Sequence, residues 1–199
     1  MATRLVWGVC AGVAALVLAS CGASVPQSPS TGSGTQWRLN AGGSAQSNAL
    51  QGLQFYPGTI TINAGDTVTW TFASLEPHTV TFLKMGQATP PPPTDPAAEA
   101  PAGGSSYDGS AFTSSGFRAG GFSYTLTFPK AGTYVYYCLI HQPVMQGTIV
   151  VNPSGTAYPF TEDGYSNQAT SLLQSDMNLA AASVSEFPYA PGGPHIAAG

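Results

Sequence analysis

The sequence predicts an all-β fold arranged as an antiparallel β-sandwich, and three observations lead to it. Short stretches alternate apolar and polar residues with the two-residue period of a strand. These stretches are 59–62, 67–72, 79–82, 133–138 and 148–151. Turn-forming residues separate them, as in 64–66 and 129–132. The chain contains 24 Gly and 17 Pro and few periodic stretches rich in Leu, Glu or Lys, a composition that favours short strands and turns over a helical bundle.

Length and charge narrow the possible functions. The chain has 199 residues, enough for one domain of ordinary size with extensions. Only 7% of its residues are charged, with five Lys and Arg against nine Asp and Glu. Because the basic residues form no cluster, we expect no binding to nucleic acid.

The N-terminus predicts export and attachment to a membrane. Arg4 precedes an apolar stretch, 5–18, that is too short to span a bilayer. It ends in Leu18-Ala19-Ser20-Cys21, which resembles a bacterial lipobox. The resemblance implies that 1–20 is a signal peptide and that Cys21 is lipidated, so that the protein is extracytoplasmic, in the periplasm or at the cell surface. Ordinary secretion with Cys21 as an incidental thiol is the alternative, and the short apolar stretch disfavours a transmembrane anchor.

Composition divides the remaining chain into three parts, the second of which contains a long insertion. Residues 21–35 form a flexible linker of Ser, Gly, Pro and Thr, and 36–152 form the folded domain. Within the domain, 84–121 is a long Pro-, Gly- and Ser-rich loop insertion, which we expect to be a surface excursion. In the C-terminal tail, 153–199, apolar residues recur at helical spacing and predict one amphipathic helix over 167–184. We expect the Pro/Gly-rich end, 188–199, to be disordered.

Cys138 is the cysteine that the sequence leaves without an assigned role. Of the three cysteines, Cys10 would leave with the signal peptide and Cys21 would be acylated, so Cys138 would remain alone. An unpaired thiol outside the cytoplasm is liable to oxidise or mispair. Ligation to a metal gives such a residue a reason to be there.

Two segments together contain the donors that copper prefers. Cys138, His141 and Met145 follow one strand and precede another, and His78 opens a third strand. A thiolate, two imidazoles and a thioether are the ligands of a blue-copper site, whereas zinc sites contain more Cys or differently spaced His and do not use Met. Each of these residues taken alone is more simply a core residue. Their joint occurrence predicts one type 1 copper ion.

Two other residues of the same types are left aside. His195 lies in the Pro/Gly-rich tail without a partner motif, and we expect it to be solvated. Met85 lies too close to the insertion to be preferred as the axial ligand.

Four segments resemble the plastocyanin-like cupredoxins: 56–70 the early strands, 78–82 the strand of the first ligand, 132–138 the strand that leads into the copper loop, and 145–151 the last ligand and strand. The resemblance covers 36–152 without the insertion. It implies a Greek-key β-sandwich, copper ligands at His78, Cys138, His141 and Met145, and one-electron transfer between larger redox proteins.

The ligand loop combines spacings from different members of that family. Two residues separate Cys138 from His141, as in plastocyanin and amicyanin. Three residues separate His141 from Met145. This spacing is shorter than in plastocyanin, longer than in amicyanin and equal to that in azurin. Met145 is therefore the ligand that most needs a test.

An electron carrier, not an enzyme, is the function that the sequence favours. A copper-binding or copper-delivery protein is the main alternative, but the chain lacks the open Met- or His-rich tracts expected of it. An enzyme resembling copper nitrite reductase would need a second cupredoxin domain and more than the three His present. A cupredoxin-shaped module without metal conflicts with the intact ligand set.

The residues around His141 predict where a partner binds. Leu139, Ile140, Pro143 and Val144 are either core residues or an apolar patch at which redox proteins dock. We favour the patch, with Leu139 buried and with Pro143 and Val144 facing outward. We expect a monomer without a small-molecule substrate, attached to the membrane through its N-terminal lipid.

The aromatic residues before the cysteine should differ in orientation. Tyr134 and Tyr136 share the side of the strand on which Cys138 lies and should point inward, whereas Tyr137 points the other way.

Overall fold

The computed structural model describes residues 34–45 and 48–185. The strands are β1 (Gln36–Ala45), β2 (Leu50–Tyr56), β3 (Thr59–Asn63), β4 (Thr67–Phe72), β5 (Thr81–Phe82), β6 (Thr113–Ser114), β7 (Ser123–Thr127), β8 (Gly132–Tyr137) and β9 (Gln146–Asn152). The helices are α1 (Pro96–Glu99) and α2 (Glu162–Ser185). The predicted signal peptide, Cys21, most of the linker, and the end of the tail with His195 lie outside the described residues.

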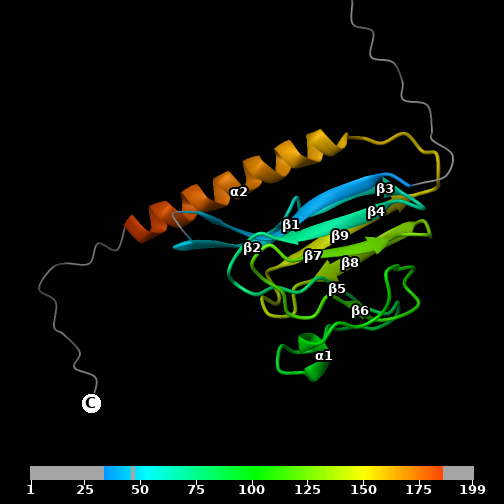
Figure 1. The fold of residues 1–199 in the computed structure, drawn as a ribbon, viewed down its shortest axis with the longest axis horizontal. Coiled ribbons are helices and arrows are strands. Elements are labelled where there is room, and N and C mark those ends of the chain that lie inside the picture. Colours follow the sequence, from blue (N-terminus) through cyan, green and yellow to red (C-terminus); the bar gives the residue numbers. More distant parts are fainter. Residues whose placement is uncertain (1–33, 46–47, 186–199) are drawn as a thin grey trace, which may run out of the picture. The chain divides into compact units, whose positions relative to one another are not determined.

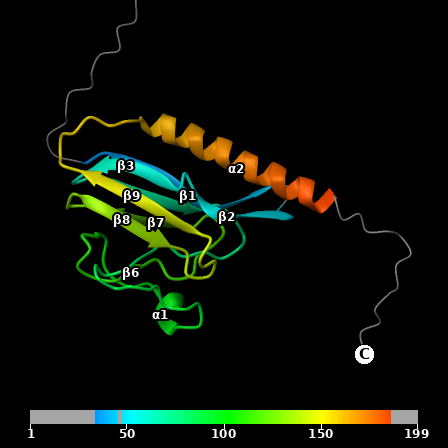
Figure 2. The ribbon, with the colours of Figure 1, turned by 180° about the vertical axis from the view of Figure 1, so that it is seen from behind.

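Two sheets form the sandwich that the alternating stretches predicted (Figure 1). One sheet has the strand order β2-β1-β4-β7 and the other the order β3-β9-β8-β5-β6. Figure 2 shows the second sheet from behind, with β9 between β3 and β8. The pairs β1–β4 and β3–β9 are parallel, so both sheets are mixed, where an antiparallel arrangement was expected. The period-2 pattern reports which face of a strand is buried and is silent about the direction of its neighbour.

The core lies between the sheets and follows the predicted alternation. In β4, the side chains of Val68, Trp70 and Phe72 are buried, and the threonines between them are half-buried. Tyr134 and Tyr136 of β8 are buried beside them, as expected from the side of the strand that they share with Cys138. Trp70 and Tyr136 meet edge to face at 5.3 Å, so residues of the two sheets interlock close to the end of β8.

Part of the insertion belongs to the folded domain, contrary to the expectation of a surface excursion. β6 pairs with β5 and thereby covers one edge of the second sheet. The side chain of Tyr107 is buried in the core, and its hydroxyl donates a hydrogen bond to the carbonyl oxygen of Leu83. Gln142 of the predicted copper loop donates from Nε2 to the carbonyl oxygen of Pro91 at 2.8 Å, so the Pro-rich stretch lies against that loop.

The predicted C-terminal helix is confirmed and begins five residues earlier than expected. Thr161 caps its N-terminus, because Oγ1 of Thr161 accepts a hydrogen bond from the N–H of Gly164 at 3.1 Å. Two acidic residues, Glu162 and Asp163, occupy the first turn, where their negative charges interact favourably with the positive end of the helix dipole. This polar first turn carries no apolar periodicity, which is why the sequence pattern placed the start at residue 167.

Helix α2 packs along β1 and β2 (Figure 1). The hydroxyl of Tyr165 accepts a hydrogen bond from the N–H of Thr61 at 2.8 Å, and the hydroxyl of Tyr56 donates to Oδ2 of Asp176 at 2.7 Å. β3 is an edge strand, so Tyr165 satisfies an otherwise open backbone donor. The helix therefore closes one side of the sandwich. Among the described residues, no helix has the length and apolar character needed to cross a membrane.

Candidate metal centre

One loop between β8 and β9 carries three of the four predicted ligands. Cys138 follows β8 directly, and Met145 directly precedes β9. The N–H of Cys138 donates to the carbonyl oxygen of Met145 at 3.0 Å, and the N–H of Met145 donates to that of His141, also at 3.0 Å. The first bond continues the β8–β9 ladder into the loop and joins its two ends, and the second closes a turn within the loop.

The fourth predicted ligand comes from a distant segment. His78 precedes β5, and its N–H and carbonyl group exchange hydrogen bonds with the backbone of Arg118 at 2.8 and 2.9 Å. β5 pairs with β8, with Thr81 opposite Tyr137, so the start of one strand lies beside the end of the other. This antiparallel register brings His78 next to Cys138.

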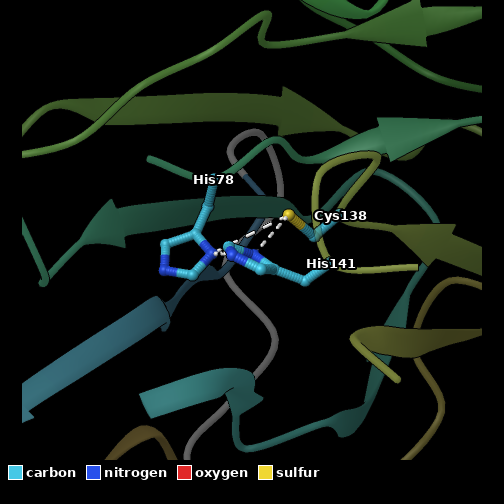
Figure 3. A group of neighbouring side chains, drawn as sticks. All are labelled: His78, Cys138 and His141. Carbon is cyan, nitrogen blue, oxygen red and sulfur yellow. Dashed lines mark hydrogen bonds between the residues drawn. The ribbon is translucent and has the colours of Figure 1, made fainter. Parts of the chain in front are cut away.

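The donor atoms of His78, Cys138 and His141 converge (Figure 3). The two Nδ1 atoms are 3.1 Å apart. Sγ of Cys138 lies 3.7 Å from Nδ1 of His78 and 3.3 Å from Nδ1 of His141. Metal bonds of about 2 Å to nitrogen and about 2.3 Å to sulfur would fit within a triangle of this size. Both imidazoles present the same nitrogen inward and leave Nε2 for a partner on the other side.

Burial governs the protonation of these groups. His78 and Cys138 are fully buried. Burial and the nearby imidazole of His141 lower the pKa of His78 to about 4, so this ring is neutral at pH 7 and can offer a lone pair to a metal. Burial also raises the pKa of the Cys138 thiol, although hydrogen bonds to the sulfur, first among them from the N–H of Thr79 at 3.4 Å, oppose that rise. Binding of a metal by this thiol therefore releases a proton.

Polar side chains that the sequence did not single out support the ligands. Oγ of Ser74 lies 2.9 Å from Nε2 of His78. Oε1 of Glu76 lies 3.4 Å from Nε2 of His141. Oγ1 of Thr79 accepts a hydrogen bond from the N–H of Leu139 at 2.8 Å. Their closeness to His78 in the sequence was the only signal available, because no pattern distinguishes a supporting hydroxyl or carboxylate from a surface one.

Met145 lies where the sequence placed it, at the end of the ligand loop. Its side chain is 1% exposed, and its backbone is bonded to both Cys138 and His141. Met85, the methionine that we did not prefer, is 67% exposed and packs against Gly109. Coordination by the Met145 sulfur stays a prediction.

The apolar residues of the loop divide between the core and the surface. Leu139 is fully buried, and Ile140 is half-buried against the core. Pro143 and Val144 are exposed, Val144 to 60%. The expected division, with Leu139 inward and the later two residues outward, is therefore present.

The donor chemistry fits copper better than zinc. One buried thiol, two imidazole nitrogens and a neighbouring thioether match the soft and borderline ligands of blue-copper sites. Structural zinc sites use four Cys or His ligands, whereas the described residues bring together three such side chains here. The residues present would hold a copper ion at this end of the sandwich.

Comparison with known proteins found a matching family model, a similar plastocyanin and similar solved structures. A family model described as copper-binding proteins of the plastocyanin/azurin family matches residues 41–152. A plastocyanin from Scenedesmus fuscus is 36% identical over 100 residues, which make up 50% of this chain and 87% of that protein. Two solved structures are similar over a comparable length. A reduced amicyanin mutant has a TM-score of 0.40 and 25% identity, covering 59% of this chain and 82% of its own. A mutant fern plastocyanin has a TM-score of 0.39 and 21% identity, covering 58% and 99%.

Proposed function

The chain belongs to the plastocyanin/azurin family of copper-binding proteins, and on that basis we propose that it is a one-electron carrier and not an enzyme. The proposed cofactor is a single type 1 copper ion. Its proposed ligands are His78, Cys138, His141 and Met145. The similarity to plastocyanins supports the carrier role, because the role it implies is one-electron transfer.

The convergence of three donor atoms from two distant segments is the observation that carries this proposal. Sγ of Cys138 and the Nδ1 atoms of His78 and His141 all lie within 4.8 Å of one another. Packing alone does not explain why two imidazole nitrogens and a thiol point toward one another, whereas ligation of a metal ion does.

Copper bound here would supply a centre that takes up and releases one electron. The chain supplies the rigidity that such a centre needs. His78 and Cys138 are fully buried and exclude water, and backbone bonds hold both ends of the ligand loop together. Because the donors already lie close together, the chain needs little rearrangement when the charge of the site changes.

We propose that the electron enters and leaves through His141. The side chain of His141 is 12% exposed, whereas His78 and Cys138 are closed off from solvent. Pro143 and Val144 lie exposed two and three residues further along the same loop. A small apolar contact suits a redox partner that must leave quickly, since transient redox complexes have small interfaces.

Repeated cycling of the copper-loaded protein tests this function against copper delivery. Ascorbate reduces the protein and ferricyanide reoxidises it, in the presence of a Cu(I) chelator. We expect the visible colour to vanish and return fully over several cycles while copper stays bound. Loss of copper to the chelator at the first reduction would favour the delivery protein and contradict the carrier.

We further propose that the mature protein is extracytoplasmic and bound to a membrane through lipid on Cys21. The apolar stretch before Cys21 and the lipobox-like residues support this location. A single acyl chain gives only marginal binding, so several chains would be needed for stable attachment. Mass spectrometry of the mature protein should find Cys21 as the modified N-terminal residue, and an unmodified Cys21 would overturn the proposal.

A further inference from the structure

One short loop reaches the outer nitrogen of both imidazoles. The loop 73–77 connects β4 to His78 and contains Ser74 and Glu76. Oγ of Ser74 lies 2.9 Å from Nε2 of His78, and Oε1 of Glu76 lies 3.4 Å from Nε2 of His141. Two histidines that are 63 positions apart in the chain are therefore held from outside by residues that are two positions apart.

The loop is held in place on several sides. Oγ of Ser74 donates to the carbonyl oxygen of Glu76 at 3.0 Å, and the carbonyl oxygen of Ser74 accepts from the N–H of Gly120 at 2.8 Å. The N–H of Glu76 donates to Oε1 of Gln51 at 3.4 Å. Because Ser74 donates to a carbonyl, it accepts from His78, which places the proton of His78 on Nε2 and frees Nδ1.

The back of His78 and Ser74 is closed by a glycine. Gly42 has a φ of +72°, and a Cβ added there would collide with Nε2 of His78 and with Oγ of Ser74. The strand β1 therefore approaches the pair closely, at a position that only glycine allows without strain.

The two outer partners differ in charge and in exposure. Ser74 is a neutral, buried hydroxyl. Glu76 is a carboxylate whose side chain is 43% exposed, beside a His141 side chain that is 12% exposed. At 3.4 Å the hydrogen bond between Glu76 and His141 is long, but its acceptor is charged. A carboxylate that accepts a hydrogen bond from the Nε2–H group orients the ring with Nδ1 inward. It also makes Nδ1 a stronger electron-pair donor toward a metal.

From these contacts we propose that Glu76 is a positioning residue that holds His141 by its Nε2–H group and lowers the reduction potential of the bound copper. The inference rests on the proposed copper site and goes beyond it. Negative charge next to a ligand stabilises the more positive Cu(II) state relative to Cu(I). Removing that charge should make the protein easier to reduce.

The substitution Glu76→Gln tests the charge, because the amide keeps an oxygen acceptor of the same size. The Glu76 side chain is 43% exposed, so an effective dielectric constant between about 40 and the value of about 80 for water applies. Loss of one charge should then shift the one-electron equilibrium toward the reduced protein by about three- to tenfold. Tenfold corresponds to 59 mV for one electron, so the potential should rise by roughly 30 to 60 mV.

A matched control removes the same charge elsewhere. Asp163 is exposed in the first turn of α2, whereas Glu76 lies in the loop beside His141. D163N should change the equilibrium by less than about twofold, because solvent and salt screen a remote surface charge.

The substitution E76A separates the hydrogen bond from the charge. In zinc-substituted protein, which is diamagnetic, NMR detects the Nε2 proton of His141 and its exchange with water without any electron transfer. We expect slow exchange in the unaltered protein and in E76Q, and faster exchange in E76A.

Two results would overturn this inference: a potential of E76Q that differs from the unaltered protein no more than D163N does, or equal proton exchange in the unaltered protein and E76A. Either result would leave the proposed function standing if the unaltered protein is blue and cycles reversibly. A colourless copper complex would instead remove the proposed function itself.

Discussion

Replacing Thr79 with valine removes one hydroxyl from the interior next to the ligand loop and leaves a side chain of similar shape. Thr79 is fully buried, and its Oγ1 accepts the N–H of Leu139 at 2.8 Å and the hydroxyl of Thr81 at 3.0 Å. Leu139 directly follows Cys138, so this bond fixes the backbone at the point where the chain leaves β8. In T79V the buried N–H of Leu139 has lost this acceptor.

The cost follows from which groups lose their partners. A buried donor left without an acceptor costs about 1 to 3 kcal/mol. The hydroxyl of Thr81 keeps Oγ of Ser114 at 2.8 Å, so it adds little. The free energy of unfolding of the metal-free protein should therefore fall by about 2 kcal/mol in T79V. T79S keeps the hydroxyl and loses one buried methyl group, which costs about 0.8 kcal/mol.

Urea denaturation of the metal-free proteins, followed by tryptophan fluorescence, measures both changes. Metal must be absent because a bound ion stabilises the native state by mass action and masks the difference. The copper-loaded T79V should remain blue, since the backbone N–H of Thr79 still donates to the sulfur at 3.4 Å. If T79V were as stable as T79S, the bond to Leu139 would not hold the loop as we infer.

Three further predictions, the last with a control substitution, test other parts of the molecule. Met145→Gln should lower the reduction potential, because an amide oxygen favours Cu(II) over Cu(I), and an unchanged potential and spectrum would show that Met145 only packs. Val144→Glu, at a 60% exposed position, should slow electron exchange with the physiological partner without altering the spectrum; unaltered kinetics would show that the electron leaves at another surface. Met177→Ala should lower the free energy of unfolding by about 2 kcal/mol, because Met177 lies on the buried face of α2. Leu179→Ala, at a 65% exposed position, should change it by less than about 0.5 kcal/mol, and equal effects of the two would argue against the docking of α2.

The ligand loop was the part of the site that the sequence predicted best, for a local reason. Cys138, His141 and Met145 lie within eight consecutive residues, and a strand on each side limits where the loop can go. His78 was found because it opens an alternating stretch. The structure brings the donors of His78, Cys138 and His141 together, and their coordination of copper stays a prediction.

The supporting contacts could not be predicted, because they join segments that no periodicity connects. Glu76 meets His141 across 65 positions, and the backbone of Arg118 meets that of His78 from within the insertion. Tyr107 looked like one aromatic residue in a Pro- and Gly-rich loop, yet it completes the core beside Phe82 at 4.6 Å. Such positions depend on how the chain closes, which composition does not reveal.

The strand pattern gave the sandwich but left its connections open. The buried alternation of Val68, Trp70 and Phe72 follows from period 2 alone. The parallel pairing of β1 with β4 depends on the turn and crossover between them, which the alternation does not encode. The polar start of α2 was missed for a similar reason, since its cap at Thr161 precedes the apolar spacing.

The visible spectrum of the oxidised, copper-loaded protein, compared with that of Cys138→Ser, tests the central claim most directly. A thiolate bound to Cu(II) gives intense charge-transfer absorption, so the unaltered protein should be blue. C138S should lose the colour, and because a hydroxyl replaces a buried thiol of similar size, the metal-free fold should stay largely intact by circular dichroism. A colourless Cu(II) complex of the unaltered protein, or a C138S variant that remains blue, would contradict the assignment of Cys138 as the copper ligand.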